Sequence, residues 1–167
     1  REMRSLAEHV SYPITNLANA SALLFEEMDR LNWAGFYIRQ GEELLLGPFQ
    51  GKVACTRIPL GKGVCGTAAK SGQTQLVKDV HEFPGHIACD SASNSEIVVP
   101  LWKDGEVWGV LDIDSPEKAR FDEKDQEGLE PLPACWKSSC KKAARLTELN
   151  VYAIIGMIPD FNNQYRT

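Results

Sequence analysis

The stretch Glu96-Ile-Val-Val-Pro-Leu-Trp-Lys-Asp-Gly-Glu-Val-Trp-Gly-Val-Leu-Asp-Ile-Asp114 decides the fold. Its two apolar runs, 96–102 and 106–114, flank Lys103-Asp-Gly105, a turn that is typical of a β-hairpin. Two strands joined by so short a turn run antiparallel. The hairpin therefore predicts an antiparallel sheet around which the rest of the chain is arranged.

Two carboxylates interrupt the second strand of this hairpin. Because side chains alternate between the faces of a strand, Asp112 and Asp114 share one face, about 7 Å apart. Leu111 and Ile113 point to the other face. At that separation the two charges repel by about 2 kcal/mol at an effective dielectric of about 20, which is more than about one pKa unit. Such a pair binds a cation or holds one proton, and the alternative interpretation is a solvated strand face.

Short periodic segments surround the hairpin. Apolar spacing predicts helices over 12–31, 61–70 and 121–129. Alternation and apolar runs predict strands over 32–39, 43–49, 57–60, 74–78, 96–102 and 106–114. A long polar loop covers 80–95, and Asp122 is the expected N-cap of the last helix. This order predicts one α+β domain, with a mainly antiparallel sheet and helices against one face.

The composition is that of an ordinary globular domain. The chain has 167 residues, of which 43% are hydrophobic and 25% charged. A net charge of −5 argues against nucleic acid or an anionic membrane as a partner, because both favour a basic surface. No apolar run approaches the roughly 18 residues of a membrane span, and no signal peptide is recognisable. Five cysteines are an odd number and too few for a secreted disulfide scaffold, so a cytoplasmic location is expected.

The loop 85–96 holds the densest chemistry in the chain. It places Cys89 among carboxylates and small hydroxyl residues, with His86 inside the loop and His81 just before it. A thiol with a pKa near 8.5 is only about 3% thiolate at pH 7, so a nucleophilic Cys89 needs a nearby histidinium or a cluster of backbone N–H groups. The alternative is a polar surface loop with an incidental thiol.

Other residues allow fewer conclusions. Cys65 lies near the start of a predicted helix, whose dipole favours a thiolate, but a packed core thiol is an equal alternative. The set His81, His86, Cys89 and Asp90 matches no common zinc spacing. No metal and no cofactor are therefore expected.

Taken together, seven segments resemble the free methionine-(R)-sulfoxide reductases, which are enzymes built on a GAF domain. The resemblance covers about Ala18 to Leu129, and the ordered set of segments with three cysteines is far more specific than any one segment. The segments are Asn32-Trp-Ala-Gly-Phe-Tyr37, Leu46-Gly-Pro-Phe-Gln-Gly-Lys52, Gly63-Val-Cys-Gly-Thr67, Asp79-Val-His81, Gly85-His-Ile-Ala-Cys-Asp90, Ser93-Asn-Ser-Glu-Ile97 and Gly109-Val-Leu-Asp-Ile-Asp114.

The resemblance implies a GAF fold, a six-stranded antiparallel sheet flanked by helices, commonly as a homodimer. It implies that Cys89 attacks the sulfoxide sulfur and that Cys55 then closes a disulfide, with Cys65 as the alternate thiol. Thioredoxin would restore the thiols. It also implies that free methionine sulfoxide is bound by Trp33, Tyr37, Glu96, Asp112 and Asp114. Trp33 would lie against the methyl group of the substrate.

The residues themselves suit this chemistry. A sulfoxide loses its oxygen only when that oxygen is protonated, and crowded carboxylates keep a proton near neutral pH. The resulting sulfenic acid needs a second thiol, which condenses with it to a disulfide. Two other classes are considered. A GAF sensor module has no use for three cysteines around carboxylates, and a redox switch without a substrate leaves the carboxylates unexplained.

The C-terminal part departs from the family. We expect a catalytic domain over 1–135, including the N-terminal helix, and an atypical tail over 136–167. After Leu129 the helical pattern stops, and Trp136-Lys-Ser-Ser-Cys-Lys-Lys142 has no apolar stripe. The codons TGG AAA AGC TCC TGC AAA AAA, read with one extra T in front, encode the amphipathic Leu-Glu-Lys-Leu-Leu-Gln-Lys. The tail is thus predicted to be a one-base frameshift product, which sequencing the source gene would test.

Overall fold

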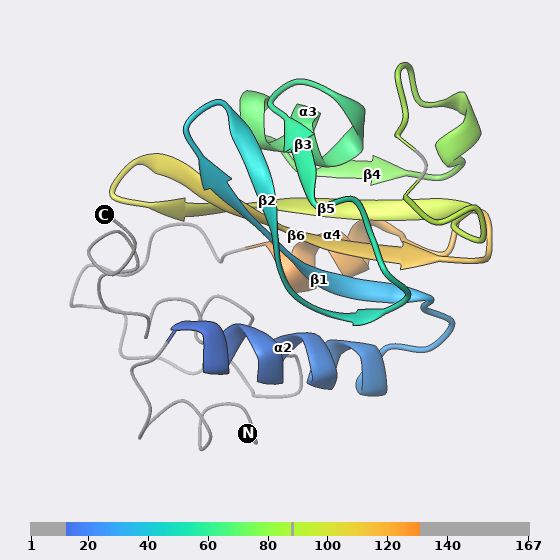
Figure 1. The fold of residues 1–167 in the computed structure, drawn as a ribbon. Helices are drawn as coiled ribbons and strands as arrows, with labels where there is room; N and C mark the ends of the chain where they lie inside the picture. Colours follow the sequence, from blue (N-terminus) through green and yellow to red (C-terminus); the bar gives the residue numbers. More distant parts are fainter. Residues whose placement is uncertain (1–12, 88, 131–167) are drawn as a thin grey trace.

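The computed structural model describes residues 13–87 and 89–130 (Figure 1). In chain order its elements are α2 (Pro13–Glu27), β1 (Trp33–Gln40), β2 (Glu43–Gly51), β3 (Arg57–Pro59), α3 (Gly63–Ser71), β4 (Gln75–Val77), the 3-10 helix η1 (Val80–Glu82), β5 (Ser95–Lys103), β6 (Glu106–Ser115) and α4 (Glu123–Leu129). The six strands form one sheet in the order β3-β2-β1-β6-β5-β4, and every neighbouring pair is antiparallel. The predicted α+β class with a six-stranded antiparallel sheet is confirmed.

Helices cover both faces of the sheet, so the expectation of helices against one face was wrong. On one face α2 and α4 enclose a core to which the strands contribute residues such as Phe36, Ile97 and Leu111. On the other face α3 packs over a second core that includes Tyr37 and Val98. Figure 1 shows α3 and α2 on opposite sides of the sheet. The strands are apolar on both faces, and a pattern of this kind does not say which helix covers which face.

Local signals set the boundaries of most elements. The side chain of Asp122 accepts hydrogen bonds from the backbone of the first turn of α4, in a capping box with Asp125. Gly72 ends α3 in a left-handed conformation at φ 66°, which glycine adopts at little cost. The helix predicted over 12–31 ends earlier, at Glu27. Beyond that end Arg30 takes a left-handed φ of 63°, and this conformation breaks the helical path although apolar side chains continue.

The register of the central strands places the polar side chains. Glu96 of β5 lies opposite Asp114 of β6, and Val98 lies opposite Asp112. All four therefore face α3, while Ile97 and its neighbours on the other face join the core under α2. Nearer the turn the register shifts between Leu101 and Trp102, a β-bulge that leaves one extra residue on β6.

Two expectations from the sequence concern the C-terminal part of the chain. The domain boundary at 135 and the frameshifted tail 136–167 both lie outside the described residues. Of the described helices, none has the length and apolar character needed to cross a lipid bilayer.

Candidate active site

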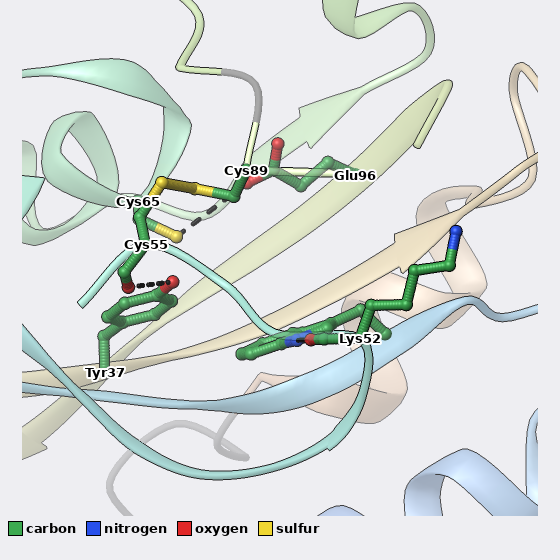
Figure 2. Close-up of a disulfide and its surroundings, with 7 residues drawn as sticks. Tyr37, Lys52, Cys55, Cys65, Cys89 and Glu96 are labelled. Carbon is green, nitrogen blue, oxygen red and sulfur yellow. Dashed lines mark hydrogen bonds between the residues drawn. A yellow bond between two sulfur atoms is a disulfide. The ribbon is translucent and has the colours of Figure 1, made fainter. Parts of the chain in front are cut away.

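A disulfide joins two loops on the face of the sheet that α3 covers. Cys55 lies between β2 and β3, and Cys89 lies in the loop that precedes β5. Their sulfur atoms are bonded, with the Cα atoms 5.4 Å apart (Figure 2). Cys65, in the first turn of α3, is free and buried beside them. The three cysteines singled out by the sequence thus meet at one place.

A small cavity lies beneath these loops, with a volume of about 30 Å³. Since one water molecule needs about 10–15 Å³, the cavity holds a few waters at most. An amino acid of the size of methionine does not fit while the disulfide is closed. Its lining combines apolar side chains with a polar floor, and comprises Ile58, Gly63, Val64, Cys65, His86, Ile87, Cys89, Asp90, Ser93, Glu96, Asp112 and Asp114.

Three carboxyl groups form the floor of the cavity. Burial raises the pKa of Asp112 to about 6. Burial, and then the charge of Asp112, raise the pKa of Glu96 and that of Asp114 well above their usual values. The side chains of Glu96 and Asp112 are only 7% and 6% exposed, so the alternative of a solvated strand face is excluded. Crowded, dry carboxyls of this kind keep protons near neutral pH.

The Cys65 thiol touches this acidic floor. Its Sγ atom donates a hydrogen bond to Oε1 of Glu96, at 3.8 Å. Burial raises the pKa of Cys65 well above its usual value, and the charges of Asp112 and Glu96 add to the effect. Of the two interpretations drawn from the sequence, the structure favours the buried, protonated thiol.

Of the two histidines in the described residues, only His86 lines the cavity that Cys89 also lines. His86 lines the cavity, but burial and then the charge of His81 lower its pKa, which favours the neutral imidazole. His81 lies outside the cavity lining and pairs through Nδ1 with Asp79, at 2.8 Å. Of the two aids to a thiolate that the sequence suggested, the lowered pKa of His86 favours backbone N–H groups over a histidinium.

Trp33 and Tyr37 support the cavity from outside its lining. The Trp33 ring stacks on Tyr37 and on Phe49, with centroids 5.9 and 5.3 Å apart. Nε1 of Trp33 donates to the carbonyl of Lys52, at 3.1 Å, and the Tyr37 hydroxyl donates to the carbonyl of Cys55, at 3.0 Å. Figure 2 shows the Tyr37 hydroxyl directed at Cys55. In the disulfide state these two aromatic residues hold the loop that carries Cys55.

Asp90, which sequence reasoning considered only as a metal ligand, connects the two cysteine loops. Its carboxylate accepts a hydrogen bond from Asn32 Nδ2 at 3.3 Å and lies 3.7 Å from Lys52 Nζ. A backbone N–H of Ala92 also binds it and lowers its pKa. Lys52 belongs to the Cys55 loop, and Asp90 directly follows Cys89, so this ion pair spans the two loops. The only sequence signal was the adjacency of Asp90 to Cys89.

An antiparallel six-stranded sheet with helices on both faces and a cavity under α3 defines the class of the protein. The GAF domain family matches residues 15–132, and the chain belongs to this family. Within it, the predicted resemblance to the free methionine-R-sulfoxide reductases is confirmed.

Three relatives document the similarity. The free methionine-R-sulfoxide reductase of Escherichia coli (strain K12) is 53% identical over 134 residues, which are 80% of this chain and 81% of that protein. The enzyme of the same name from Saccharomyces cerevisiae is 52% identical over 135 residues, 76% of this chain and 75% of that protein. The structure of the Neisseria meningitidis free methionine-R-sulfoxide reductase in complex with its substrate is 50% identical, with a TM-score of 0.72 over 74% of this chain and 75% of that chain.

Proposed function

We propose that the chain reduces free L-methionine (R)-S-oxide to L-methionine. The observation that carries the proposal is the Cys55–Cys89 disulfide beside a cavity floored by buried carboxyls. The names of the Escherichia coli and yeast relatives support the choice of substrate, as does the substrate complex of the Neisseria enzyme.

In the first step the Cys89 sulfur, as thiolate, attacks the sulfoxide sulfur. A carboxyl of the cavity floor protonates the sulfoxide oxygen as this happens, because a neutral hydroxyl leaves sulfur far more readily than an oxide. The S–S bond formed by this attack then breaks as the hydroxyl passes from the substrate sulfur to the Cys89 sulfur, and an electron pair stays on the substrate sulfur. The substrate sulfur is reduced to the thioether of methionine, and the cysteine is oxidised to a sulfenic acid.

In the second step the Cys55 thiol attacks the sulfenic sulfur of Cys89, and the hydroxyl leaves as water. The product is the disulfide present in the structure. Cys65 is the alternate resolving thiol, but its burial and its hydrogen bond to Glu96 favour Cys55 in this role. A dithiol reductant, which we take to be thioredoxin, then accepts the oxidation by thiol–disulfide exchange.

Substrate recognition follows from the charge of the cavity floor. Glu96, Asp112 and Asp114 hold the substrate ammonium and supply the acid, and Trp33 and Tyr37 lie against the methyl group once the loops part. Because the closed cavity is small, we expect the disulfide to be reduced before the substrate binds. We further propose a cytoplasmic location, where thiols are kept reduced, and a homodimer.

The test is NADPH oxidation in the presence of thioredoxin, thioredoxin reductase and one separated epimer of free methionine sulfoxide. We expect turnover with the R epimer, little with the S epimer, and none with a Cys89→Ser variant. A sensor module would consume no NADPH at all. A redox switch without a substrate would consume a single equivalent, independent of the sulfoxide. Either result would refute the proposal.

A further inference from the structure

Three buried side-chain atoms that could ligate a metal ion lie close together at the floor of the cavity. The Sγ atom of Cys65, one oxygen of Glu96 and one oxygen of Asp112 all lie within 4.8 Å of one another. Each residue is less than one-tenth exposed. Among the described residues, Oδ1 of Asp112 has no hydrogen-bond partner, although the residue lines the cavity. A buried acceptor without a partner is costly, and a bound ligand would supply the missing contact.

The spacing of one pair of these ligand atoms is close to that of tetrahedral coordination. Zinc–sulfur and zinc–oxygen bonds of about 2.3 and 2.0 Å, at the tetrahedral angle, place the two ligand atoms about 3.5 Å apart. The Sγ atom of Cys65 lies 3.8 Å from Oε1 of Glu96. A shift of a few tenths of an ångström therefore brings this pair to coordinating geometry. The lining that the structure describes contains no lysine or arginine, so no fixed cation already occupies this place.

We propose that Cys65, Glu96 and Asp112 bind one divalent cation of the zinc class. The soft sulfur ligand favours Zn²⁺ over Mg²⁺ and Ca²⁺, which prefer oxygen alone. The thiol proton, and any proton held by the two carboxyls, are released to solvent as the bonds to the metal form. The closed cavity, too small for an amino acid, has room for an ion and a water as fourth ligand. This set differs from the one weighed on sequence spacing, which comprised His81, His86, Cys89 and Asp90.

The proposed site coincides with the place assigned to the substrate ammonium. If the proposed function holds, a bound cation excludes the substrate and removes the acid from the reaction, so it acts as a competitive inhibitor. Binding itself does not depend on that function, because its ligands are present in the disulfide form.

The test is a titration of the disulfide form with Co²⁺, a spectroscopic substitute for Zn²⁺, without reductant. All variants carry Cys135→Ser and Cys140→Ser, because both residues lie outside the described part of the chain and are thiols. We expect one Co²⁺ per chain, displaced by Zn²⁺, with the near-ultraviolet absorption of a cobalt–thiolate bond. Cys65→Ser should abolish that absorption, and Asp112→Asn should weaken binding by about tenfold or more.

Asp104→Asn, an exposed substitution in the hairpin turn, is the matched control and should bind as the parent does. If circular dichroism shows Asp112→Asn to be misfolded, Glu96→Gln replaces it. Cobalt binding without thiolate absorption, or binding that survives Cys65→Ser unchanged, would overturn the proposal. Because the readout needs no turnover, its failure is distinct from failure of the reductase assay.

Discussion

Asp112→Asn should make the folded protein more stable and less active. In the folded state burial raises the pKa of Asp112 from 3.8 to about 6. Above that pH the ionised carboxylate lies among Glu96, Asp114, Cys65 and Tyr37, none of which supplies a positive charge. The stability that a neutral Asp112 allows is fully present below pH 3.8 and is lost as the pH rises through about 6.

The magnitude follows from the shift. About two pKa units correspond to about 3 kcal/mol at pH 8, where the carboxylate is ionised in both the folded and the unfolded state. At pH 4 the corresponding loss is below about 1 kcal/mol, because the folded protein keeps Asp112 protonated. An asparagine, which never ionises, regains up to these amounts. For a domain of this size, 3 kcal/mol raises the melting temperature by roughly 6–12 °C.

The assay is urea unfolding of the disulfide form at pH 4 and pH 8, in buffer with a chelator so that no cation fills the cavity. Asp104→Asn, in the exposed turn, is the control and should change stability by less than about 0.5 kcal/mol at either pH. The reasoning is refuted if Asp112→Asn loses stability at pH 8, or if its gain is the same at both pH values.

Three further predictions concern the proposed reaction. Cys89→Ser should abolish even a single turnover, while Cys55→Ser should still release about one methionine per chain. The methionine released is quantified without reductant. A Cys89→Ser protein that completes one turnover contradicts the assignment. Glu96→Gln should lower kcat/KM by about tenfold or more, because a charge-assisted contact of roughly 1.5–3 kcal/mol is lost. An N-acetylated substrate should be equally poor, and comparable activity on the free and acetylated forms would count against this. Lys52→Met should slow disulfide closure about two- to fivefold at low salt, since an exposed ion pair such as that with Asp90 contributes at most about 1 kcal/mol. The rate of closure is measured by thiol trapping. An equal effect at high salt would exclude an electrostatic cause.

The sequence predicted the elements that local signals determine. The β5–β6 hairpin, the Asp122 cap and the stop at Gly72 all depend on neighbouring residues, and all three are present. The end of α2 was predicted too late because Met28 and Leu31 continue the apolar pattern. They pack against the core from a turn rather than from a helix. Which face of the sheet α3 covers depends on contacts between residues far apart in the sequence, and the periodicity of one segment does not determine such contacts.

The site was predicted in part. Strand alternation correctly placed Asp112 and Asp114 on one face, away from the apolar core under α2. Their burial was left open, because it depends on how the loops and α3 close over the sheet. The bridging role of Asp90 was missed for the same reason, since its partner Lys52 lies 38 positions away along the chain and only the folded loops bring them together.

The β-bulge near the turn of the β5–β6 hairpin affects which insertions and deletions the gene can tolerate. Between Glu96 and Leu101, adding or removing one residue would exchange the two faces of the strand and bury the carboxylate under α2. Beyond the bulge, from Trp102 to the turn, a change in length leaves the paired carboxylates in register. We therefore expect naturally occurring length differences in this hairpin to collect at its tip. The loop would then vary in length, while the opposite end of the two strands, which carries the buried carboxyls, would not.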